Sequence, residues 1–258
     1  MRVSLNSYNP EFEAHLMSRW RCKTSAGGGS KNLTVVALER RDSPFINKFI
    51  DVADKDTHLP NIKQIILDSA LKTAKTFFES KFEGFNKVKV LMGICDSKPC
   101  GLLVANIPKL SENGEVCCTS RHNSSKNEGE LDWLVTWGTK DIGGIRGVGK
   151  ALVGEFFKTL KGDRIRDVYV KSELPENSYA QFFYESLGFE FLGEKREKLE
   201  RRTSKPYLVD SYCDPNDMIV PMIITRKNIR GTLDFLQKSM PREDLKGKSI
   251  DIEKLVSM

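Results

Sequence analysis

The chain has 258 residues, of which 39% are apolar and 29% are charged, an ordinary balance for a globular protein of one large domain or two small ones. No stretch approaches the roughly 20 apolar residues needed to cross a bilayer, and six cysteines at this length fall short of a disulfide scaffold. The formal charge of +6, from 41 basic and 35 acidic residues, is a modest bias.

The beginning of the chain carries Glu11 and Glu13 and no apolar run, which is unlike a secretory signal. We therefore expect a cytoplasmic protein with reduced thiols and no membrane partner. Neither the cysteines nor the histidines have the spacing of a zinc site. Since His15, His58 and His122 are far apart in the sequence, we expect no bound metal.

Residues 1–32 form a short mixed arm that includes the glycine- and serine-rich run 25–30. This run has too little side chain to pack and is typical of a flexible linker or loop. The arm ahead of it either docks or stays mobile. From residue 33 the pattern becomes regular, and a strand is predicted over 34–38.

Two helices are predicted next. Ser43 and Pro44 supply an N-cap and a first-turn proline for the first helix. A longer helix follows Pro60, with apolar residues at helical spacing up to Phe78.

Several strands and helices are then expected. Two strands joined by the short turn 96–99 predict an antiparallel hairpin. After the polar loop 111–129 the order is strand, glycine-rich turn, helix, strand, helix, strand, strand. The expected bounds of these elements, hairpin strands first, are 88–94, 101–107, 131–137, 146–151, 152–160, 167–171, 178–187, 190–195 and 218–225.

The last segment, 226–258, contains an amphipathic helix around 229–236 and a short apolar pattern at Ile250, Ile252 and Leu255. About thirty residues bury too little surface to be stable alone, so we expect an extension packed on the preceding domain.

A glycine-rich run, Arg146-Gly147-Val148-Gly149-Lys150-Ala151, lies between the strand 131–137 and the helix 152–160. The first N–H groups of a helix have no intrahelical partner, glycines let an anion approach the main chain, and the helix dipole favours negative charge. The run is therefore typical of a pyrophosphate-binding turn.

A second run, from Asn177 through Ala180 and Tyr184 to Leu187-Gly188-Phe189, follows one strand later. Read as Arg-x-x-Gly-x-Ala, the first run resembles the acyl-CoA loop of the GNAT superfamily of N-acetyltransferases, and the second resembles a later signature of that family. The resemblance covers about residues 33–225 in the order of elements. It implies an α/β fold with a mixed, mostly antiparallel twisted sheet flanked by helices, and acetyl-CoA as cosubstrate.

In the resembled family the main chain of the strand before the glycine turn binds the thioester and pantetheine. Here that implies Leu134, Val135, Thr136 and Trp137. The amides from Arg146 through Ala151, namely Arg146, Gly147, Val148, Gly149, Lys150 and Ala151, would hold the pyrophosphate, and Lys150 adds positive charge. Asn177 would contact the pantetheine arm, or else be a plain N-cap. The link 138–145 is longer and richer in glycine than in the family.

The resemblance also implies the catalytic groups. Tyr184 occupies the position of a tyrosine that protonates the leaving thiolate, although a helical aromatic there could equally fill the core. Glu130 and, after it, Asp132 are candidates for a base that relays the proton of the amine, since they share one face of a strand. Both could instead be solvated residues at the start of a strand. Glu128 is a lesser candidate.

We expect a single domain over 33–225, flanked by the arm 1–32 and the extension 226–258, that transfers an acetyl group directly to an amine. Two alternatives stay open. One is a CoA-binding module without transfer activity, and the other is a nucleic-acid-binding protein that uses the basic cluster 195–205. The acceptor is not encoded in a recognisable motif, because a fold does not fix an acceptor. A homodimer would be common in the resembled family.

Overall fold

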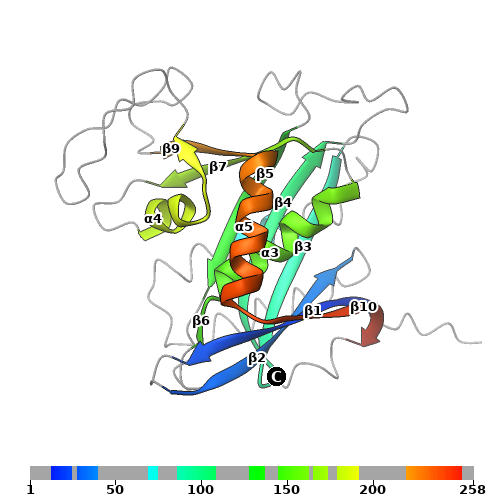
Figure 1. Cartoon of the computed structure of the whole chain (residues 1–258). Coiled ribbons are helices and arrows are strands. Elements are labelled where there is room, and N and C mark those ends of the chain that lie inside the picture. The colour runs from blue at the N-terminus through cyan, green and yellow to red at the C-terminus, as the bar shows by residue number, and fades with distance from the viewer. Residues whose placement is uncertain are drawn as a thin grey trace, which may run out of the picture.

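The structure is a computed structural model (Figure 1). It describes residues 13–24, 28–39, 69–74, 86–108, 128–136, 145–162, 165–173, 179–191 and 219–251.

The described chain contains the strands β1 (Glu13–Thr24), β2 (Ser30–Leu38), β3 (Asn86–Cys95), β4 (Lys98–Pro108), β5 (Glu128–Thr136), β6 (Ile145–Arg146), β7 (Asp167–Glu173), β8 (Glu190–Phe191), β9 (Ile219–Thr225) and β10 (Arg242–Asp251). Its helices are α3 (Val148–Thr159), α4 (Tyr179–Ser186) and α5 (Arg226–Ser239). A short 3-10 turn, Leu160–Gly162, follows α3, and residues 69–74 are also helical.

The strands form one sheet in the order β10-β1-β2-β3-β4-β5-β7-β9-β8, with β6 paired to β1 beside this path. All neighbouring pairs are antiparallel except β5 and β7, which run parallel. A parallel pair needs a crossover, and α3 lies within this one. The predicted mixed, mostly antiparallel sheet flanked by helices is therefore confirmed.

The predicted hairpin is present as β3 and β4, which pair antiparallel over their whole length. Its two turn residues, Asp96 and Ser97, have φ values of 48° and 60°. Positive φ at both central residues matches the right-handed twist of the flanking strands. The hairpin is confirmed, but its turn is shorter than the predicted 96–99, because Lys98 and Pro99 already pair as part of β4.

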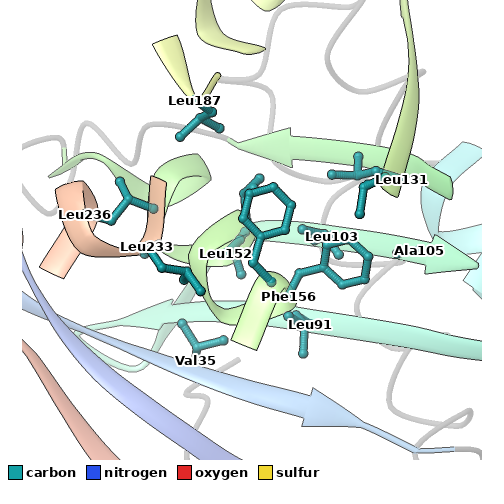
Figure 2. Close-up of a cluster of buried hydrophobic side chains, with 14 of the residues drawn as sticks. Val35, Leu91, Leu103, Ala105, Leu131, Leu152, Phe156, Leu187, Leu233 and Leu236 are labelled. Atoms are coloured by element: carbon teal, nitrogen blue, oxygen red, sulfur yellow. The ribbon is translucent and has the colours of Figure 1, made fainter. Parts of the chain in front are cut away.

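Helices α3 and α5 lie side by side over the same face of the sheet (Figure 1). Figure 2 shows Leu152 and Phe156 of α3 between the strands and Leu233 of α5. Gly101 of β4 lies beneath the first turn of α3: a Cβ there would fall 2.6 Å from Cγ1 of Val148. The helix can therefore approach the sheet closely only because this residue lacks a side chain.

Helix α3 begins at Val148, four residues earlier than predicted. Gly149 and Lys150 thus belong to the first turn of the helix and not to a preceding loop. Burial explains the difference, because Val148 and Gly149 are both buried against the sheet and α4.

The predicted arm contributes a long strand. β1 pairs with β2 on one side and with β10 on the other, and its Lys23 and Thr24 also pair with β6. β10 contains Ile250 of the predicted apolar pattern, whereas Ile252 and Leu255 lie outside the described residues. The two ends of the described chain therefore meet at one edge of the sheet.

A buried ion pair joins these end strands to α3. Both carboxylate oxygens of Glu155 accept hydrogen bonds from Arg242, at 3.0 Å each. Ser18 of β1 donates to the same carboxylate at 2.6 Å, and Trp20 donates to Ser18 at 2.9 Å. The side chains of Glu155 and Arg242 are only 3% and 5% exposed, so this pair is largely removed from water.

Candidate functional site

β5 and β7 are paired over only four residues each, from Glu128 with Asp167 to Leu131 with Val170. β5 nevertheless continues to Thr136, and β7 continues alongside β9 to Glu173. Among the described strands, the second half of β5 pairs only with β4. The two parallel strands therefore separate, and one edge of the second half of β5 has no strand partner within the described part of the chain.

A β-bulge lies where the separation begins. The register between β4 and β5 shifts between Val104 and Ala105, whose partners are Trp133 and Leu131, so Asp132 is the extra residue. A bulge bends its strand and increases the local twist. We attribute the divergence of β5 from β7 to this residue.

The glycine turn forms the start of α3. Gly147 is the N-cap, with φ 95° and ψ 4°, and its carbonyl accepts a hydrogen bond from the Ala151 amide at 2.9 Å. Gly147 has no side chain that could cap the helix, and the first turn of α3 has no acidic residue. The amides that follow Gly147 therefore keep the geometry that suits an anion.

The two sequence motifs meet at Gly149. A Cβ on this residue would lie 3.1 Å from Cζ of Phe183 in α4 and 3.5 Å from Cγ2 of Thr136 in β5. The helix start, the free end of β5 and α4 thus converge on one point. Leu134 is partly buried and packs on the core, while Val135 is buried.

Two basic residues flank this turn. Arg146 is exposed on β6. Lys150 is half-buried, and its Nζ lies 5.8 Å from the centroid of the Phe235 ring on α5. The sequence pattern did not single out Phe235, because α5 lies 85 residues further along the chain and carries no motif of its own.

Tyr184 is 6% exposed and belongs to the hydrophobic core. Its ring makes edge contacts with Phe183 and Phe189, with centroids 5.3 Å away in both cases. Burial raises the pKa of Tyr184 above its ordinary value, because the phenolate would lose its hydration. The hydroxyl is therefore held neutral, and it is a weaker acid than that of an exposed tyrosine.

Glu130 is half-buried near the point where β5 and β7 part. In the pairing register it stands between Asn106 of β4 and Tyr169 of β7. Asp132 is also half-buried, and its Oδ2 atom is shielded from solvent.

Asn106 and Tyr169 were not candidates in the sequence. Cross-strand partners share one face of a sheet, so both lie beside Glu130 on the face away from α3. The Oδ1 atom of Asn106 is buried and accepts no hydrogen bond from the residues that the structure describes. Only the pairing register reveals this group, because nothing in the sequence relates the three positions.

Two expected cofactor contacts, Trp137 and Asn177, lie outside the described residues, as do the basic cluster 195–205 and most of the link 138–145. Within the described ranges, no group of three His, Cys, Asp or Glu side chains could hold a metal ion. No helix in the same part of the chain is long and apolar enough to span a membrane.

The described chain also has a surface hollow of about 470 Å³ between the C-terminal end of α3 and one side of α5, from Arg226 to Gln237. Phe157, Lys161, Ile229 and Arg230 contribute to its walls. It lies at the other end of α3 from Gly147 and is not part of the candidate site.

No protein-family model matches the sequence, and no curated protein matches it significantly. Solved structures do match. A GNAT-family acetyltransferase candidate from Desulfovibrio desulfuricans is 12% identical over 75% of this chain and 98% of its own, with a TM-score of 0.44. The chain resembles GNAT acetyltransferases in structure.

Two further matches were crystallised with ligands. An aminoglycoside acetyltransferase in complex with coenzyme A and kanamycin is 15% identical, covering 78% of this chain and 98% of its own, with a TM-score of 0.43. NAA60 of Arabidopsis thaliana, in complex with acetyl-CoA, is 14% identical over 76% and 99%, with a TM-score of 0.42. At these identities no residue role is transferred from them to this chain.

Proposed function

We propose that this chain is an acetyl-CoA-dependent N-acetyltransferase that transfers the acetyl group directly to an amine. The observation that carries the proposal is the convergence at Gly149, where an uncapped helix start, the diverging end of β5 and α4 meet. This arrangement offers amides for a pyrophosphate next to a strand edge with free main-chain groups. A ligand with a pyrophosphate and an extended amide-containing arm fits both features.

In the proposed mechanism, the main chain of β5 between Leu134 and Thr136 binds the pantetheine arm and polarises the thioester carbonyl. Glu130, through water, accepts the proton of the amine as nitrogen attacks the carbonyl carbon. The carbon–sulfur bond then breaks, and Tyr184 donates its hydroxyl proton to the departing thiolate. Positioning of the two substrates supplies much of the remaining acceleration.

The nature of the acceptor is also a proposal. A carboxylate at position 130, beside the acceptor oxygen of Asn106, suits a group that has only donors, as a protonated amine does. Aminoglycosides and protein N-termini are both amines of this kind. The geometry favours neither.

The test is isothermal titration of acetyl-CoA into the whole chain and into two pairs of variants. Gly149→Glu places a carboxylate in the turn, and Gly149→Ala controls for the contact with Phe183. Lys150→Glu reverses a charge in the first turn of α3, and Lys161→Glu makes the same change beyond the other end of that helix. We expect binding to be lost with Gly149→Glu and weakened about tenfold with Lys150→Glu, by analogy with a close charge pair, whereas both controls bind.

Absence of binding to the unmodified chain would refute the proposed function. Binding without release of CoA in the presence of a broad panel of amines and peptides would instead support a CoA-binding module. An affinity for nucleic acid that depends steeply on salt concentration would instead support a nucleic-acid-binding protein that uses the basic cluster 195–205.

A further inference from the structure

Among the described residues, Phe235 is the large apolar side chain that is exposed, with 52% of its surface accessible. The other apolar residues of α5 face inwards: Ile229, Leu233 and Leu236 are all buried. Phe235 therefore contributes little to the packing of α5, and its exposure has no structural explanation within this helix.

Part of the Phe235 ring is open to solvent, since 52% of the residue is accessible. Gly231, one turn earlier on α5, has nothing within 4 Å of the position a Cβ would occupy, so the ring does not lie over it. The helix surface next to the ring therefore has room for a second planar group.

The ring also lies close to the glycine turn. Helices α3 and α5 run antiparallel, so the C-terminal half of α5 flanks the start of α3. Met240, just after α5, has its Cε 3.0 Å from the position of a Cβ on Gly147. Lys150, in the first turn of α3, has its Nζ 5.8 Å from the centre of the Phe235 ring.

We propose that Phe235 is the stacking surface for the adenine of CoA, and that Lys150 bridges this ring and the phosphates. This inference rests on the proposed function. A pyrophosphate held by the amides after Gly147 places the adenosine outside the turn, next to α5. An accessible phenyl face stacks on any base, and a lysine beside it offers positive charge to the phosphates.

The test uses the ethenoadenine analogue of CoA, whose base fluoresces and is quenched when it stacks on an aromatic ring. Affinity and quenching at saturation are measured for the whole chain, for Phe235→Ala and for Phe235→Trp. Gln237→Ala is the matched control, since Gln237 is exposed on the same helix. We expect Phe235→Ala to weaken binding about tenfold and to abolish the quenching, Phe235→Trp to retain both, and Gln237→Ala to change neither.

Unchanged affinity and quenching in Phe235→Ala would overturn the inference. A loss of affinity with the quenching intact would also overturn it, because the ring would then act without stacking. If Phe235→Ala alters only the oligomeric state in sedimentation, the ring contacts a second copy and the inference is again wrong. Failure of the unmodified chain to bind the analogue refutes the proposed function itself, which separates the two hypotheses.

Discussion

Glu130 occupies the middle of a row of polar residues that crosses three neighbouring strands, between Asn106 and Tyr169. Its position near the separation of β5 and β7 makes it the carboxylate that the proposed mechanism needs. Replacing a carboxylate that takes no part in the reaction would leave kcat unchanged. Substitution of Glu130 therefore tests its proposed role as a base directly.

We expect Glu130→Gln to lower kcat by about 10²-fold to 10⁴-fold, the usual contribution of a general base. The affinity for acetyl-CoA should not change, because Glu130 is not part of the turn. Steady-state kinetics with thiol detection of CoA, together with titration of acetyl-CoA, measure the two quantities. Glu128→Gln, two positions earlier on the same strand, is the control; an equal loss in both variants would contradict a specific role.

Tyr184 combines a core position with a proposed proton donor, and two substitutions separate these roles. Tyr184→Phe keeps the ring between Phe183 and Phe189, so we expect nearly unchanged stability in urea but a kcat about 10²-fold lower. Tyr184→Ala removes the ring and should cost about 3–5 kcal/mol of unfolding free energy. Full activity in Tyr184→Phe would show that the residue serves packing alone.

The buried ion pair between Glu155 of α3 and Arg242 of β10 fixes the end strands to the helix. Because the side chain of Glu155 is buried, Arg242→Met leaves its carboxylate without a cation, and we expect the unfolding free energy to fall by about 3–5 kcal/mol. Glu155→Gln should cost less, because Arg242 keeps its ion pair with Asp244 at 2.6 Å. Urea unfolding of the two single variants and the double variant measures the coupling between them.

An exposed ion pair between β1 and β10 provides the comparison for the buried pair of Glu155 and Arg242. Arg19 of β1 donates to Glu243 of β10 at 3.3 Å, and both side chains are largely exposed. Surface pairs of this kind contribute at most about 1 kcal/mol. If Arg19→Met were as destabilising as Arg242→Met, burial would not be the cause.

The elements differ in how far the sequence determined them. The β3–β4 hairpin and the glycine start of α3 were predictable, since turn chemistry and unpartnered amides are local properties. β10 was not, because its sequence, REDLKGKSID, is mostly charged and polar and becomes a strand by pairing with β1. The contacts of Lys150 with Phe235 and of Glu130 with Asn106 depend on register and packing, which no local pattern encodes.

At the scale of the whole molecule, three buried thiols link stability to pH. Burial raises the pKa of Cys22 from 9.0 to about 12 and that of Cys95 to about 11, and it raises the pKa of Cys100 as well. In the unfolded chain these thiols lose their protons above about pH 9, whereas in the folded chain they keep them. The unfolded state then binds fewer protons, so stability falls as the pH rises.

We expect the unfolding free energy to decrease from about pH 9 to about pH 11, between the pKa of the unfolded thiols and those of the folded ones, by up to about 1.4 kcal/mol per pH unit for each thiol. Urea titrations at several pH values measure this slope. Cys22→Ala should be less stable at neutral pH but should show a shallower decline. An identical slope in this variant would exclude Cys22 as a contributor.

The pairing of β1 with β10 has a consequence for the order of folding. Of the described strands, β1 emerges first during synthesis and β10 last, with more than two hundred residues between them. Until Arg242 appears, Glu155 lacks the cation that accompanies it into the interior, and β1 lacks its β10 partner, so that edge could pair with another chain. A nascent chain can assemble the sheet from β2 to β9, but the fold is complete only when β10 pairs with β1. A chain that ends before β10 would leave the edge of β1 available for aggregation.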